Sequence, residues 1–131
     1  MVKKLVVISL AMAVIIGFAV WEMIFTTRLY SEILDGLYEI DRIVGDAPES
    51  VDGVEVRELS DKIMDRWNGA KNTLFCLGNH TILRLVDEKL VVLSATIKSN
   101  DTTTAPAAIK SAISLVKAVS NDDLPVPTNL F

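Results

Sequence analysis

Residues 5–21 read LVVISLAMAVIIGFAVW, and this apolar run decides which architecture the rest of the chain can adopt. A helix needs about 20 apolar residues to cross a bilayer, because each residue advances about 1.5 Å and the hydrocarbon core is about 30 Å thick. The run reaches that length when residues 23–25 extend it past Glu22. We therefore predict a single transmembrane helix, with Glu22 beside Trp21 in the interfacial layer, where a carboxylate can reach water.

The residues around this run predict its orientation and its fate. Lys3 and Lys4 precede the run, and no comparable basic flank follows it. The positive-inside rule then predicts a single-pass protein of the cell membrane, with a cytoplasmic N-terminus and an extracytoplasmic domain. The competing interpretation is a signal peptide cleaved after Ala19, for which residues 17–19 offer suitable spacing. Retention is favoured because the run exceeds the apolar segment of an ordinary signal peptide, about 7–15 residues, and continues through bulky residues at 20–25.

A second span is not expected. The next most apolar stretch, 81–97, contains four charged residues, and each charge at a helix centre costs about 2.5–3.5 kcal/mol on insertion. In a chain of 131 residues, the part beyond the anchor is long enough for one domain but not for two. We expect a membrane anchor at 1–25, a helical domain at 26–121 and an extended tail at 122–131.

Charge and cysteine content restrict the function of the outer domain. All acidic residues lie at or after Glu22, so this domain is more acidic than the net charge of −4 for the whole chain suggests. No Lys/Arg cluster reverses this, and we expect no nucleic-acid partner. Cys76 is the only cysteine, so an internal disulfide is excluded and packing must stabilise the domain. We expect Cys76 to be buried as a small hydrophobe, with pairing to another chain as the alternative.

Apolar residues recur at spacings of three and four through the domain, which is typical of packed helices. The first helix should continue from the anchor without a break and end at Gly45, with Pro48 soon after. Gly36 costs about 1 kcal/mol relative to alanine inside a helix, so it marks an expected close approach of another helix. The inward residues of this helix are expected to be Leu29, Ile33, Leu37, Ile40 and Val44, with Tyr30, Leu34 and Tyr38 beside them.

Three further helices are predicted. One should run from Asp52, in a capping box with Glu55, to Gly78, with a break possible at 68–69. The next should follow directly after Asn79 in a tight hairpin, and the last should begin near Pro106 after a polar loop. The fold class we predict is all-α, an N-terminal transmembrane helix that continues into an antiparallel bundle of about four helices. The inward residues are expected to be Val56, Leu59, Ile63, Trp67, Ala70, Leu74 and Leu77 in the second helix, Ile82, Leu85, Val86, Leu90, Leu93 and Ile97 in the third, and Ile109, Ala112, Ile113, Val116 and Val119 in the fourth.

Cys76 and His80 are the residues most suggestive of chemistry. Four residues apart on one continuous helix, they could form half of a zinc site or a nucleophile with its base. A structural zinc needs about four ligands, the chain has no other Cys or His, and a turn at Gly78 would separate the pair. We therefore expect His80 to cap a turn or pack beside a helix end. Neither catalytic residues nor a cofactor or metal site are predicted, and we expect a protein that is not an enzyme.

Paired acids and apolar residues supply the remaining candidates. The acidic pairs at 35/39 and 61/65 lie off the apolar positions, which predicts solvated faces rather than acid/base groups. Trp67 has the inward spacing of the second helix, so core packing is expected in preference to a ligand site. In the tail, prolines exclude a helix, yet Leu130 and Phe131 are apolar. We expect the tail to dock on its own domain or, alternatively, on a partner.

Four short features together resemble domain-of-unknown-function family 4363, small membrane-anchored proteins of Gram-positive, mostly spore-forming bacteria. They are the anchor preceded by lysines, Trp67 followed by Lys71, His80 after the second outer helix, and Asn-Leu-Phe at 129–131. The resemblance covers nearly the whole chain, although Gly78 interrupts a region that the family pattern keeps helical, which puts the number of helices in doubt. It implies no assigned enzymatic activity, no known cofactor and work beside a multi-pass membrane protein.

Three functions are weighed on these grounds. The favoured one is a non-catalytic accessory protein whose tethered domain binds another membrane or envelope protein. The alternative is a ligand- or metal-binding domain that uses a crevice between helices, with Cys76, His80 and nearby acids as contacts. A hydrolase built on the same pair has the least support, because no Cys-His signature accompanies it.

Overall fold

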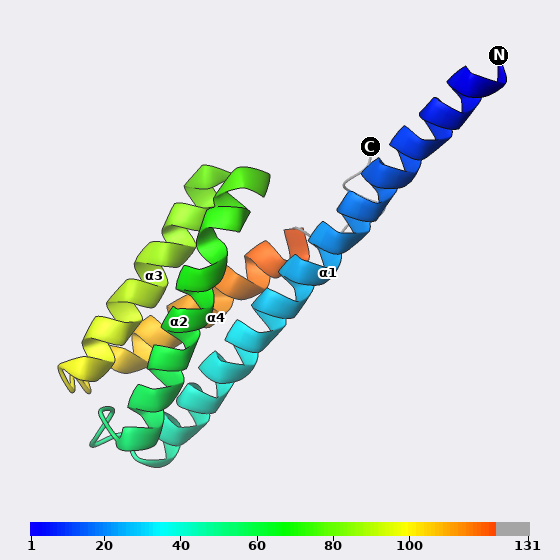
Figure 1. The fold of residues 1–131 in the computed structure, drawn as a ribbon. Helices are drawn as coiled ribbons and strands as arrows, with labels where there is room; N and C mark the ends of the chain where they lie inside the picture. The colour runs from blue at the N-terminus through cyan, green and yellow to red at the C-terminus, as the bar shows by residue number, and fades with distance from the viewer. Residues whose placement is uncertain (123–131) are drawn as a thin grey trace.

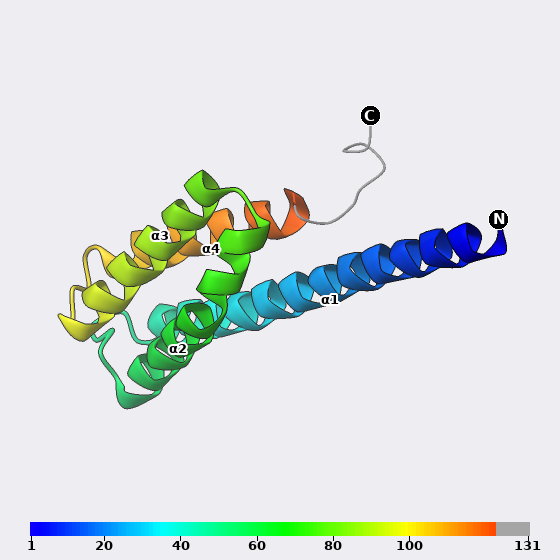
Figure 2. The same cartoon turned by 45° about the horizontal axis from the view of Figure 1, so that its top comes forward.

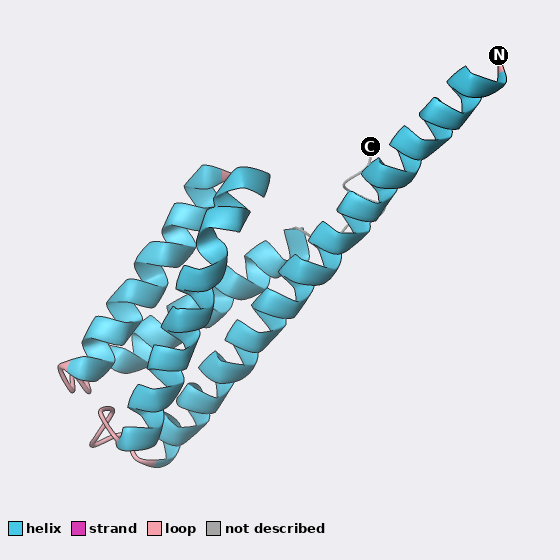
Figure 3. Cartoon of the chain, in the orientation of Figure 1, coloured by secondary structure: helices cyan, strands magenta, loops and turns pink. Residues whose placement is uncertain are grey.

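The computed structural model describes residues 1–122. It contains α1 (Val2–Asp46), α2 (Val54–Leu77), α3 (His80–Lys98) and α4 (Ala105–Asp122). Figure 3 shows these helices joined by short loops, with no strand in this part of the chain. The predicted all-α class with four helices is confirmed. Residues 123–131, which make up nearly all of the expected tail, lie outside the described part of the chain.

The four helices pack in a ring. α1 contacts α2 and α4, and α3 contacts the same two helices from the other side. Successive helices run in opposite directions in Figure 1. The shared core is made of residues that recur at helical spacing, and its largest fully buried side chains include Trp67, Tyr30, Leu29, Ile33, Leu37, Ile40, Leu90 and Ile109.

Burial, and not a break in the helix, divides α1 into two parts. The helix has 45 residues, and its first buried residue is Thr26. Residues 2–21 are exposed, and Figures 1 and 2 show this half projecting beyond the other helices. This half contains a stretch that is long and apolar enough to cross a membrane, and none of that stretch is buried against the rest of the chain. From Thr26 on, the same helix supplies one wall of the core.

The start of α2 differs from the prediction. The helix begins at Val54 and no side chain caps it, so the predicted capping box of Asp52 and Glu55 is wrong. The Asp52 carboxylate instead accepts hydrogen bonds from the Ser50 hydroxyl at 3.0 Å and from the Arg57 guanidinium at 3.2 Å. Gly53 occupies the N-cap position, so Asp52 lies one residue before it and pairs with side chains instead of the backbone of the first turn.

The α2–α3 connection is the tight turn that we predicted. Gly78 ends α2, and the Asn79 side chain caps α3 by accepting a hydrogen bond from the Thr81 backbone N–H at 2.9 Å. α2 itself passes through Asn68 and Gly69 without a break.

The inward face of α3 agrees with the prediction at Val86, Leu90, Leu93 and Ile97, which are buried, and differs at Leu85. Leu83 is only 3% exposed, whereas Leu85, which we predicted to face inward, is 44% exposed. Val91 and Val92 are also exposed, at 48% and 45%. Because α3 has apolar residues on both faces, their spacing alone does not identify the buried one.

The two loops farthest from the N-terminus are joined to each other. The backbone N–H of the fully buried Val51 donates to Oδ1 of Asn100 at 2.9 Å. Asn100 adopts a φ of 52°, a left-handed conformation that Asn tolerates better than most residues. Arg57 donates to the carbonyl oxygen of Lys98 at 3.4 Å across the same gap. This end of the bundle is closed.

Asp101 stabilises the approach to α4. Its Oδ1 accepts the backbone N–H groups of Thr103 at 3.1 Å and Thr104 at 3.0 Å. Hydrogen bonds from the side chain and backbone of Thr104 lower the pKa of Asp101, so the carboxylate stays ionised to a lower pH than an unpaired aspartate does.

Gly36 brings α1 and α2 into close contact. A Cβ atom at Gly36 would lie 2.9 Å from both Cγ1 and Cδ1 of Ile63. Ile63 is 5% exposed and belongs to the core, so a Cβ atom at this distance would force its side chain to shift. The close approach predicted at this glycine is confirmed.

We predict that Gly36→Ala is less stable than the matched variant Gly69→Ala. Both gain about 1 kcal/mol in helix propensity, but only the alanine at 36 must displace Ile63, at a cost of about 1–3 kcal/mol. Nothing lies within 4 Å of the Cβ position at Gly69. Denaturant unfolding of the full chain in detergent micelles, followed by circular dichroism, should separate the variants by about 1–3 kcal/mol. Equal stabilities would contradict the close packing.

Candidate functional site

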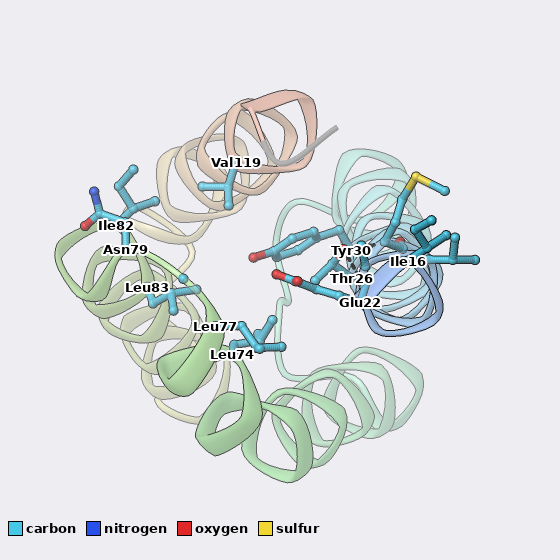
Figure 4. A pocket seen from close by; sticks show the side chains of 14 residues that line it. Ile16, Glu22, Thr26, Tyr30, Leu74, Leu77, Asn79, Ile82, Leu83 and Val119 are labelled. Atoms are coloured by element: carbon cyan, nitrogen blue, oxygen red, sulfur yellow. Dashed lines mark hydrogen bonds between the residues drawn. The ribbon is translucent and has the colours of Figure 1, made fainter. Parts of the chain in front are cut away.

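A pocket of about 460 Å³ opens at the end of the bundle nearest the apolar half of α1. One wall is α1, from Ile16 to Tyr30, and the opposite wall is the turn between α2 and α3 together with Val119 of α4. In Figure 4, Leu74, Leu77, Leu83 and Val119 lie across the cavity from the α1 side chains that include Glu22 and Tyr30. The pocket forms because α1 diverges from the α2–α3 turn at this end, as Figure 1 shows.

Most of the lining is apolar, and its polar groups are largely engaged. The Thr26 hydroxyl donates to the carbonyl oxygens of Glu22 at 2.9 Å and Met23 at 3.2 Å, within its own helix. The Asn79 side chain is occupied in capping α3. The Glu22 carboxylate is the only charged group among the described residues that line the pocket. The site therefore suits an apolar ligand better than an anion.

Cys76 and His80 do not form a site together. Cys76 is exposed near the end of α2, so the predicted burial is wrong. Leu74 takes the inward position in that turn, which directs residue 76 outward. His80 begins α3, and its ring packs edge-on against Phe75 with centroids 5.4 Å apart.

Metal binding and acid/base chemistry gain no support from the described residues. Within 1–122, no group of three or more His, Cys, Asp or Glu side chains is placed to hold a metal ion. The Arg42 Nε donates to Glu39 at 3.0 Å, and this pairing lowers the pKa of Glu39. Asp61 forms an ion pair with Lys98 at 3.1 Å. A general acid needs a raised pKa, the opposite of what Glu39 has.

Trp67 is a core residue with a polar anchor. The side chain is fully buried, and its Nε1 donates to Oδ1 of Asp87 at 2.7 Å. The Lys71 ammonium lies 3.4 Å from the same oxygen. Trp67 and Lys71, four residues apart on α2, therefore meet one carboxylate of α3, which gives this pair of residues a structural role.

Sequence reasoning missed Asp87. Its position, four residues after Leu83 and three before Leu90, places it beside the buried face of α3. A carboxylate at such a spacing is a signal for a partnered polar group in a helical core. The two apolar candidates of the tail, Leu130 and Phe131, lie outside the described residues.

Comparison of the chain with protein-family models, with curated proteins and with solved structures gives no match.

We predict that Asp87→Ala destabilises the domain, because it leaves the indole N–H of Trp67 buried without an acceptor. The loss should be about 1–3 kcal/mol. Asp87→Asn keeps an acceptor oxygen for Trp67 and should retain more of the stability, while Lys71→Met removes only a partly exposed ion pair and should cost less than about 1 kcal/mol. Urea unfolding monitored by Trp fluorescence measures all three. A stability loss from Lys71→Met as large as that from Asp87→Ala would contradict the greater importance that we assign to the Trp67–Asp87 hydrogen bond.

Proposed function

We propose that this chain is a non-catalytic, membrane-tethered accessory protein whose helical domain binds another membrane or envelope protein. The observation that carries the proposal is that one uninterrupted helix exposes an apolar stretch and then builds the core of the domain. Exposed apolar surface is unfavourable in water by about 25 cal/mol per Å², and a bilayer removes that cost. In this arrangement α1 is both the membrane anchor, single-pass and uncleaved, and the first helix of an antiparallel bundle.

Aromatic side chains support the proposal that the membrane surface lies near Trp21. Its ring stacks on Phe25 with centroids 5.5 Å apart, and Phe18 lies 5.6 Å away on the other side. Aromatic rings, Trp and Tyr above all, gather at membrane interfaces. This level is just before Thr26, where burial in the domain begins.

Lys3 and Lys4 support a cytoplasmic N-terminus, which puts the helical domain outside the cytoplasm. The resemblance to family 4363 fits this location and a multi-pass partner, and it stands as part of the proposal.

The outward face of α3 is our candidate for the partner surface. α3 packs on α2 and α4, and its exposed side carries Leu85, Val91 and Val92. Exposed apolar residues grouped on one helix face are typical of protein interfaces. For the alternative function, ligand binding, the pocket is the supported site, because Cys76 and His80 lie on different helices and do not form a site together.

Cys76 makes the topology directly testable, because it is exposed and is the only cysteine. We predict that a membrane-impermeant maleimide labels Cys76 on intact cells as completely as on permeabilised cells. Cys76→Ser is the control for background labelling. Labelling that needs permeabilisation would contradict an extracytoplasmic domain.

For partner binding, we predict that a photo-crosslinking amino acid at Val92 gives a discrete adduct in living cells, identified by mass spectrometry. The same amino acid at Asn68, exposed on α2, is the matched control and should give none. Val91→Asp should abolish the adduct, because a carboxylate in an apolar interface is costly to desolvate. Equal adducts from both positions, or none from either, would refute the α3 surface.

A further inference from the structure

We propose that the pocket beside α1 holds one acyl chain of a phospholipid from the surrounding bilayer. This inference rests on the proposed insertion of α1 into a membrane, and it adds a ligand that the tethering function does not require.

The pocket and the apolar stretch share residues. Ile16, Ala19 and Val20 belong to the run that we place in the membrane, and they also line the pocket. The facing wall includes Leu77 and Leu83 (Figure 4). Because the apolar surface is continuous along α1, a lipid chain beside the helix can enter the pocket without crossing water. Few other ligands have such a route.

Size and charge favour the chain of a phospholipid over other amphiphiles. The volume of about 460 Å³ falls within the range of about 300–1,000 Å³ that is usual for small-molecule sites. Glu22 repels the carboxylate of a free fatty acid, and no basic residue among the described lining residues offsets this. The phosphate would therefore stay outside, at the interface, and only the hydrocarbon would be bound.

The two ends of the bundle differ in a way that fits this role. The far end is closed by the hydrogen bond between Val51 and Asn100. The end with the pocket has the half-buried Leu77 and Ile82 at the α2–α3 turn, facing the level of Glu22. These apolar groups are continuous with the exposed apolar half of α1, which is the surface that a lipid chain would cover.

The test uses the full chain in vesicles of phosphatidylethanolamine and phosphatidylglycerol that contain a phosphatidylethanolamine with a diazirine on its acyl chain. After irradiation, proteolysis and mass spectrometry locate the adducts. We expect adducts on α1, which report membrane insertion alone, and further adducts near Leu77, Leu83 and Val119, which report the pocket.

Two variants in the exposed N-terminal half of α1 form a matched pair. Ala19→Phe places a ring in the pocket and should reduce the adducts on the facing wall about tenfold, while Ala13→Phe, in the same apolar run but not in the lining, should leave them unchanged. Both variants should keep the adducts on α1.

Each other outcome overturns the inference in a distinct way. Adducts on α1 alone would leave the anchor intact and remove the lipid site, whereas no adducts anywhere would remove the proposed insertion as well. Equal losses in the two variants would show that the facing wall is not labelled through the pocket. Adducts on that wall that appear only after deletion of residues 123–131 would identify the tail of the chain, and not lipid, as the occupant.

Discussion

The helical continuity of α1 between Trp21 and Leu29 is the constraint on which the rest of the structure depends. Within a few residues the helix passes from an exposed Trp21 to a fully buried Leu29, with no loop to absorb a change of direction. A helix satisfies its backbone hydrogen bonds internally, so the same segment is compatible with hydrocarbon on one side and a packed core on the other. The Thr26 hydroxyl returns a hydrogen bond to the Glu22 carbonyl at this boundary, which keeps a buried polar group satisfied. The domain is therefore carried on a stiff helix and not on a flexible linker.

This continuity explains why the bundle has one closed and one open end. Gly36 lets α2 pack closely against α1 in the middle of the domain. At the far end, a hydrogen bond joins the loops that contain Val51 and Asn100. Toward the apolar half, α1 runs on past its partners and diverges from the α2–α3 turn (Figure 1). The pocket is the space left by that divergence, and its position beside the apolar run follows from the geometry of the helix.

Local signals in the sequence predicted the features that depend on few residues. The turn at Gly78 and Asn79, the close approach at Gly36 and the number of helices all follow from backbone preferences and spacing. Features that depend on distant partners were predicted poorly. Leu85 is exposed because α3 packs on α2 and α4 through the face that holds Leu83, Val86 and Leu90. Asp52 lies one residue before the N-cap Gly53 and pairs with Arg57 instead of capping α2.

The candidate site was the least predictable part, since none of its geometry is local. Residues from all four helices line the pocket, and no motif joins them in the sequence. Cys76 and His80 attracted attention by their spacing, but the turn between them sends the two side chains to different helices. The spacing of Asp87 from Leu83 and Leu90 signals a partnered carboxylate, but only the structure identifies Trp67 as the partner.

The stiffness of α1 can be measured as a distance between its exposed apolar half and the half that packs in the bundle. Spin labels at Val7→Cys and Asp35→Cys, in a Cys76→Ser background within lipid nanodiscs, would lie on opposite sides of Thr26 at exposed positions of one helix. Pulsed electron paramagnetic resonance should then give a narrow distribution centred near about 42 Å, because 28 residues at about 1.5 Å each separate the labels. A broad or clearly shorter distribution would mean that the helix bends or breaks between the two labels, and the account of one rigid helix would be wrong.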